Sequence, residues 1–135
     1  MIARLISANS SELLKINGEE LKQSIKASEG RTVLSENVVI QPAIDGLTMS
    51  EIAAAFGADL ILLNLFDVFE PKVSGLEVKD AKDTVKRLKE LTGRPIGVNL
   101  EPVDPDVKME STKFELPKGR IATAESMRRA EELGF

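Results

Sequence analysis

Carboxylate and amide side chains follow three apolar stretches of this sequence, and they are the residues with which the chain could do chemistry. They are Glu36, Asn37, Asn64, Asp67, Glu70, Asn99 and Glu101. Cysteine and histidine are absent, which excludes disulfides, thiolate chemistry and imidazole bases or ligands. Carboxylates can act as general acids and bases, and their oxygens suit a hard cation such as Mg²⁺. We therefore predict Glu36 and Glu101 as catalytic residues and as ligands of Mg²⁺.

The sequence around these residues predicts a sheet that brings them to one edge. Strands are predicted within RTVLSENVVIQP, DLILLN and RPIGVNLEP, which are rich in β-branched residues or continuously apolar. Because side chains alternate along a strand, an inward Asn64 places Leu60 and Leu62 on its own face. The alternation also turns Ile61 and Leu63 toward the helices. The predicted inner set is Leu34, Glu36, Leu60, Leu62, Asn64, Gly97, Asn99 and Glu101.

A ligand site is predicted at the carboxyl ends of these strands, where open parallel sheets and barrels both bind their ligands. Its predicted substrate-binding residues are Asn37, Asn64, Asp67, Asn99, Lys118 and Arg120. We place Asn37, Asp67 and Glu70 on the adjoining loops. The two basic residues come shortly before the last predicted helix, where they could hold a phosphate or a carboxylate.

A structural role is the alternative for several of these residues. Acids and amides after strands also cap helices and satisfy the backbone of turns, and this interpretation stays open for the three loop residues. For the two basic residues a solvated loop is the simpler interpretation, because isolated cations are normally exposed. The functional interpretation is favoured for Glu36, Asn99 and Glu101, since inward carboxylates are costly without a ligand, a cation or a partner.

Helical patterns alternate with the predicted strands and define the fold class. They occupy residues 10–29, the segment SEIAAAFG, residues 79–92 and the segment after Thr123. We predict one α/β domain over residues 1–135, with N-terminal helices in 1–29 and three β/α units in 30–135. The predicted fold is a partial (β/α)₈ TIM barrel. A small open three-layer α/β sandwich is the alternative.

The composition narrows the classes of function. The net charge is −4 with basic and acidic residues interspersed, so no basic stripe suits nucleic acid. No apolar stretch approaches the roughly 20 residues of a membrane span, and the first residues lack the apolar region of a signal peptide. We therefore expect a cytoplasmic protein that binds neither nucleic acid nor a membrane.

Three long segments carry a resemblance to a known family. They are ASEGRTVLSENVV, AAAFGADLILLNLFDVFEPKVSGL and LTGRPIGVNLEPV. Through them the chain resembles the N-terminal part of a family of uncharacterised bacterial barrel proteins, often labelled phosphoenolpyruvate phosphonomutase-like or haloacid dehalogenase-like. The mutase label implies a Mg²⁺-assisted reaction on a small oxoacid. It also implies further strands after the helix TAESMRRAEELGF.

Two functions are carried forward from the sequence. The first is a Mg²⁺-assisted lyase or mutase that acts on a small phosphorylated or carboxylated oxoacid. The second is a non-catalytic module that binds a ligand or forms oligomers. The turn AAAFGAD is echoed by AEELGF at the end of the sequence, so we expect the leading part of a longer β/α pattern. Three strands would leave two free edges and an exposed inner face, which predicts a homodimer or pairing with the missing barrel portion.

Overall fold

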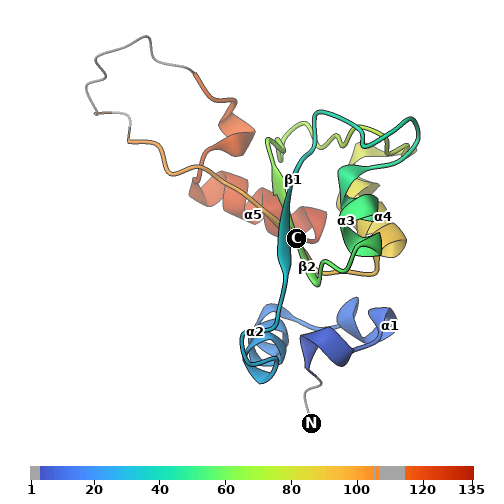
Figure 1. The fold of residues 1–135 in the computed structure, drawn as a ribbon. Helices are drawn as coiled ribbons and strands as arrows, with labels where there is room; N and C mark the ends of the chain where they lie inside the picture. The colour runs from blue at the N-terminus through green and yellow to red at the C-terminus, as the bar shows by residue number, and fades with distance from the viewer. Residues whose placement is uncertain (1–3, 105, 107–114) are drawn as a thin grey trace.

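A three-stranded parallel sheet forms the centre of the molecule (Figure 1). The structure is a computed structural model that describes residues 4–104, 106 and 115–135. Strands β1 (Leu34–Val38), β2 (Leu60–Asn64) and β3 (Ile96–Val98) lie side by side in that order, so β2 is the central strand. The register pairs Glu36 with Leu62, and Leu62 with Gly97. These three positions therefore form one row across the sheet.

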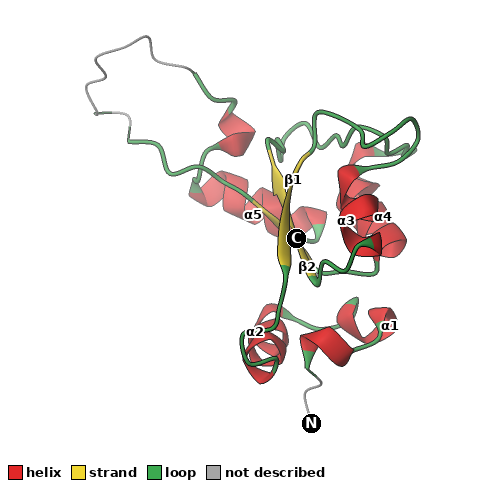
Figure 2. Cartoon of the chain, viewed as in Figure 1, coloured by secondary structure: helices red, strands yellow, loops and turns green. Residues whose placement is uncertain are grey.

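Helices connect and precede the strands, as Figure 2 shows. The α-helices are α1 (Ser10–Leu13), α2 (Gly18–Ala27), α3 (Met49–Ala55), α4 (Thr84–Thr92) and α5 (Ala124–Leu133). Short 3-10 turns are η1 (Leu5–Ser7), η2 (Ala81–Asp83) and η3 (Lys118–Arg120). Helices α1 and α2 lie near the start of β1, whereas α3 and α4 follow β1 and β2 and lie side by side (Figure 1).

Polar caps determine where three of the helices begin. The side chains of Asn17, Thr48 and Thr123 each accept a hydrogen bond from a backbone N–H in the first turn of α2, α3 and α5. These bonds satisfy donors that a helix leaves unpaired at its start. Helices α4 and α5 end at Gly93 and Gly134, which have φ angles of 63° and 91°. Glycine adopts this left-handed conformation without the steric cost that a side chain adds.

The core lies between one face of the sheet and the helices that follow the strands. On β2, the side chains of Ile61 and Leu63 are 1% and 0% exposed. The residues that complete this core are Val39, Phe66, Val68, Val73, Val85, Leu88, Ile96, Ala130 and Leu133. Helices α4 and α5 supply four members of this set, and Ala54 of α3 packs against it. All three helices therefore cover the same face of the sheet.

The opposite face of the sheet carries no helix of this core and is partly open. Leu34 is 53% exposed and Val38 is 37% exposed, and Leu60 and Leu62 are half-buried. We call the surface of Leu34, Val38, Leu60 and Leu62 the open face. Ile61 and Leu63 point to the helices while their neighbours point away, so the predicted alternation along β2 is confirmed.

The predicted fold class is confirmed in two respects, the α/β class and the parallel direction of the strands. The chain is an α/β protein with a parallel three-stranded sheet, preceded by helices in the N-terminal segment. The sheet is open, which agrees with the alternative of an open α/β sandwich. No helix within the described residues is long and apolar enough to cross a membrane.

We predict that Leu88→Ala lowers the free energy of unfolding by about 2–5 kcal/mol, because it opens a cavity beneath the sheet. Leu88 is 0% exposed. Leu91→Ala on the same helix is the matched control, since Leu91 is 40% exposed. We expect the control to cost less than about 1 kcal/mol. Urea denaturation followed by circular dichroism measures both values, and similar losses in the two variants would contradict the assignment of the core.

Candidate functional site

Two amide side chains meet where β2 and β3 end. Asn64 is the last residue of β2, and the backbone N–H of Asn99, just after β3, donates to the carbonyl of Leu63 at 2.9 Å. The Asn99 Nδ2 lies 3.5 Å from the Asn64 Oδ1, which makes a long hydrogen bond. The Nδ2 of Asn64 and the Oδ1 of Asn99 have no protein partner within the described residues. Both residues are half-buried, so the pair can reach a ligand.

The backbone directly after Asn64 has an unusual conformation. Leu65 has a φ angle of 63°, in the left-handed region that non-glycine residues rarely adopt. Its N–H donates to the Asn64 Oδ1 at 2.8 Å, which holds the amide of Asn64 in place. This bond fixes the orientation of the Asn64 side chain at the end of the strand.

An ion pair lies beside the amide pair. The Arg120 Nη2 is 2.7 Å from the Glu101 Oε1, and the side chains of Arg120 and Glu101 are 15% and 35% exposed. The two residues are also joined through the backbone, because the Glu101 N–H donates to the Arg120 carbonyl at 2.7 Å. Val98 and Leu100 pack against the core, so Asn99 and Glu101 share the other face of the chain. We call the edge formed by Asn64, Asn99, Glu101 and Arg120 the rim.

Asp67 stabilises the loop after β2, and the backbone of this loop is joined to the η3 turn. Its Oδ1 accepts hydrogen bonds from the backbone N–H groups of Phe69 and Glu70 at 2.8 Å and 3.2 Å. The backbone N–H of Val68 donates to the carbonyl of Gly119 at 3.1 Å. A Cβ atom at Gly119 would lie 1.7 Å from the Asp67 Oδ1, so only glycine fits against this carboxylate. The geometry of Asp67 matches the turn role that the sequence left open for it.

Asn37 does not lie on a loop at the rim, and this expectation was wrong. It lies within β1, opposite Leu63, and only 5% of its surface is exposed. Alternation from the exposed Glu36 turns Asn37 toward the helices rather than toward the open face. Its Nδ2 donates to the Ser35 Oγ at 3.0 Å, and its buried Oδ1 has no partner.

The side chains of the remaining predicted residues make no hydrogen bond or ion pair within the described residues. Glu70 and Lys118 are exposed. Glu36 is exposed on the same face as the amide pair, and it makes no hydrogen bond or ion pair in the described part of the chain. The rim thus brings together Asn64, Asn99, Glu101 and Arg120, with Glu36 one row below.

Glu36 and Glu101 are offset along the strands. Glu36 lies level with Gly97, and Glu101 follows Gly97 by four residues. At about 3.3 Å per residue this places Glu101 about 13 Å further along, and two strand spacings of about 4.8 Å separate the chains sideways. Glu101 is also paired with Arg120. This arrangement does not fit one cation shared by both carboxylates.

A Mg²⁺ ion at this edge could therefore be bound by only one of the two predicted carboxylates, Glu36 or Glu101. Within residues 4–104, 106 and 115–135, no group of three or more acidic residues is close enough to hold a metal ion. Mg²⁺ often keeps several waters and takes only one or two carboxylates together with oxygens of its substrate. Glu36 fits that mode as a single ligand, and Mg²⁺ binding stays a prediction.

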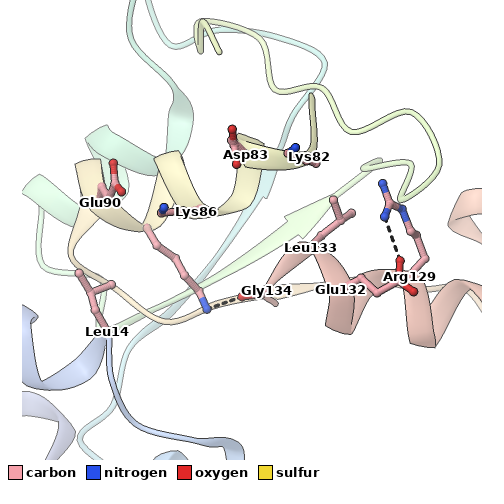
Figure 3. Close-up of a pocket in the computed structure, with 10 residues that line it drawn as sticks. Leu14, Lys82, Asp83, Lys86, Glu90, Arg129, Glu132, Leu133 and Gly134 are labelled. Carbon is pink, nitrogen blue, oxygen red and sulfur yellow. Dashed lines mark hydrogen bonds and ion pairs between the residues drawn. The ribbon is translucent and has the colours of Figure 1, made fainter. Parts of the chain in front are cut away.

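A pocket that the sequence did not indicate lies between α4 and α5. It has a volume of about 600 Å³, and the close-up in Figure 3 shows the residues that line it. Lys89 of α4 donates a hydrogen bond to the carbonyl of Gly134 at the end of α5, and both residues line the pocket. Burial lowers the pKa of the Lys89 ammonium below its ordinary value of 10.5. The bond satisfies a carbonyl at the C-terminal end of α5, where cations are favourable.

We predict that the contribution of Lys89 to stability rises with pH. Because its pKa is lowered in the folded state, the unfolded chain binds more protons at this side chain, and stability increases as pH approaches 10.5. The difference in unfolding free energy between the wild type and Lys89→Met should therefore grow with pH. Urea denaturation at a series of pH values measures it, with Lys86→Met on the same helix as the control for charge loss. A difference that shrinks toward high pH would contradict the prediction.

These elements define an α/β protein with an open parallel sheet and a polar rim at the carboxyl ends of its strands. The chain belongs to a family described as a domain of unknown function, DUF7916, which it matches over residues 6–135. Comparisons with curated proteins and with solved structures gave no match. The resemblance to phosphonomutase-like proteins therefore stays a prediction.

Proposed function

We propose that this protein binds a small carboxylated or phosphorylated oxoacid at the rim. The observation that carries the proposal is the meeting of Asn64 and Asn99 at the ends of adjacent parallel strands. Their free amide groups point away from the core, and a strained residue, Leu65, holds one of them in place. Such strain persists only where surrounding structure maintains it, and it is common at ligand sites.

Each rim residue has a role that follows from its chemistry. The Nδ2 of Asn64, which is unpartnered within the described residues, and the second N–H of the Asn99 Nδ2 donate hydrogen bonds to the oxygens of the ligand. Arg120 supplies a positive charge that attracts an anion, and the exposed Lys118 adds to it. Glu36 is a carboxylate without a partner in the described chain, so it is free to act as an acid or base. Mg²⁺, bound through Glu36 and water, would supply charge stabilisation to a lyase or mutase reaction.

The arrangement of helices supports the proposal that the sheet is an arc of a (β/α)₈ barrel. The strands follow one another in sequence order, and right-handed crossovers between such strands place every helix on the same face. Helices α3, α4 and α5 all contribute to the core on that face. In a barrel the opposite face becomes the interior, and the rim becomes the mouth where ligands bind.

We expect Asn99→Leu to weaken the binding of oxalate, pyruvate or phosphate by roughly tenfold to a hundredfold, because hydrogen bonds to charged groups contribute about 1.5–3 kcal/mol. Isothermal titration calorimetry measures the affinities with and without Mg²⁺. Glu36→Gln should abolish any gain in affinity that Mg²⁺ provides. The control is Gln23→Leu, which removes an amide from α2 at the other end of the sheet. Absence of heat with all three anions would remove the proposal.

A second candidate function is assembly with another copy of the chain. The supporting observation is a run of exposed apolar residues on and around β1: Val33, Leu34, Val38, Ile40 and Ile44. β1 is also an edge strand, because β2 is its only neighbour in the sheet that the described residues form. An exposed apolar edge strand favours pairing with another chain. We infer that a two-fold dimer would cover this edge or the open face.

Assembly predicts a defined response to one substitution on the open face. Leu34→Glu should shift the chain from dimer to monomer in light scattering, because it places a charge where the partner would pack. Met127→Glu is the control, since Met127 has a similar exposure of 55% but lies on α5. A wild-type chain that is monomeric at all concentrations tested would contradict this second function.

A further inference from the structure

The ion pair at the rim holds an arginine whose hydrogen-bonding capacity is mostly unused. The guanidinium of Arg120 has five N–H donors, and one nitrogen, Nη2, contacts Glu101. It makes no other hydrogen bond within the described residues. Its other nitrogens are not among the fully buried unpaired atoms of the described residues, and the side chain as a whole is 15% exposed. A largely buried arginine with open donors is suited to bind an oxoanion.

Backbone hydrogen bonds hold Arg120 and Glu101 in position independently of their side chains. The Glu101 N–H donates to the Arg120 carbonyl, and the Glu101 carbonyl accepts from the N–H of Ala122 at 2.8 Å. The N–H of Arg120 donates to the carbonyl of Pro117 at 2.9 Å. The two side chains would therefore stay next to each other if their ion pair opened. The guanidinium is positioned beforehand, which lowers the entropic cost of binding an anion.

The Glu101 carboxylate has the same chemistry as the ligand class proposed for the rim. It presents an anionic oxygen to Arg120 at 2.7 Å, as a carboxylate or phosphate ligand would. It lies two residues from Asn99 on the same face of the chain, so Arg120 and the amide pair border one another. An incoming anion at the amide pair would meet the negative charge of Glu101 at short range.

We propose that Glu101 is a built-in competitor for the anion site of Arg120, and that an oxoacid ligand binds by replacing it. The ligand would exchange the single contact for a two-point contact with the guanidinium fork. The displaced carboxylate is partly exposed and would turn to solvent. This inference rests on the proposed function only for the class of ligand, a small oxoanion. It makes Arg120 a specificity-determining residue. It makes Glu101 a residue that lowers the affinity for any anion that must replace it.

The test is the affinity for inorganic phosphate and oxalate, measured by calorimetry on the full chain. Glu101→Gln should tighten binding by about threefold to tenfold, because it removes a competing charge but keeps the shape of the side chain. Arg120→Gln should weaken binding by at least about tenfold, and Arg120→Lys should give an intermediate loss because it lacks the fork. The controls are Arg129→Gln and Glu132→Gln, which break an ion pair of 2.9 Å on α5 away from the rim. Neither control should change the affinity.

A purely structural ion pair gives the opposite pattern for Glu101→Gln. The melting temperature would fall and the affinity would fall or stay unchanged, which overturns the inference. If Asn99→Leu weakens binding while Glu101→Gln does not tighten it, the proposed function stands and this inference fails. If Glu101→Gln tightens binding while Asn99→Leu has no effect, the Arg120 site stands and the amide site fails. Absence of binding in every variant overturns both.

Discussion

Burial of the central strand and its continuation is the constraint on which the rest of the structure depends. Ile61 and Leu63 are buried within β2, and Phe66 and Val68 are fully buried in the chain that follows. Strands β1 and β3 both pair with β2. Helices α3, α4 and α5 cover the face of the sheet on which Ile61 and Leu63 lie. Removing any of these apolar side chains from water stabilises the fold by about 1.5–3 kcal/mol. The sheet, its helices and its loops are therefore positioned with respect to this one segment.

The polar residues of the candidate site are interleaved with these buried anchors. Asn64 comes between Leu63 and Phe66, and Asp67 comes between Phe66 and Val68. Each polar side chain is thus attached to backbone that the core holds in place, which limits its movement. The left-handed conformation of Leu65 belongs to the same arrangement, because it lets the chain turn between two anchored positions. Precision at a binding site depends on this kind of support.

Three acidic residues of this region, Glu36, Asp67 and Glu101, are used in different ways. Glu101 is neutralised by Arg120, and Asp67 is occupied by backbone N–H groups of its own turn. Glu36 has neither kind of partner within the described residues. Sequence alone cannot separate these cases, because the same carboxylate serves an ion pair, a turn or a ligand equally well. The role of each carboxylate depends on which other segment of the chain folds back beside it.

The features of the strands could be predicted from the sequence, whereas the partners of the charged side chains could not. The alternation along β2 and the parallel direction of the strands were predictable, because strand periodicity and parallel connections are local or nearly local properties. The side of the sheet on which Asn64 and Asn99 meet followed from them. The contact between Glu101 and Arg120 spans 19 positions of the chain, and the contact between Lys89 and Gly134 spans 45. Such contacts depend on the path of the chain after a strand or helix ends, which periodicity does not encode.

The contact between Gly119 and Asp67 also bears on how the sequence can change over time. A methyl group at position 119 would lie 1.7 Å from the Asp67 carboxylate, so it is incompatible with aspartate at position 67. Loss of the Asp67 side chain would release the N–H groups of Phe69 and Glu70, and a Cβ atom at position 119 would still lie 2.9 Å from the backbone nitrogen of Val68. A shorter residue at position 67 therefore does not free position 119, because the backbone of the loop crowds this site as well as the carboxylate. Glycine at 119 is required by the path of the chain, whereas the residue at 67 is constrained by the turn that it stabilises.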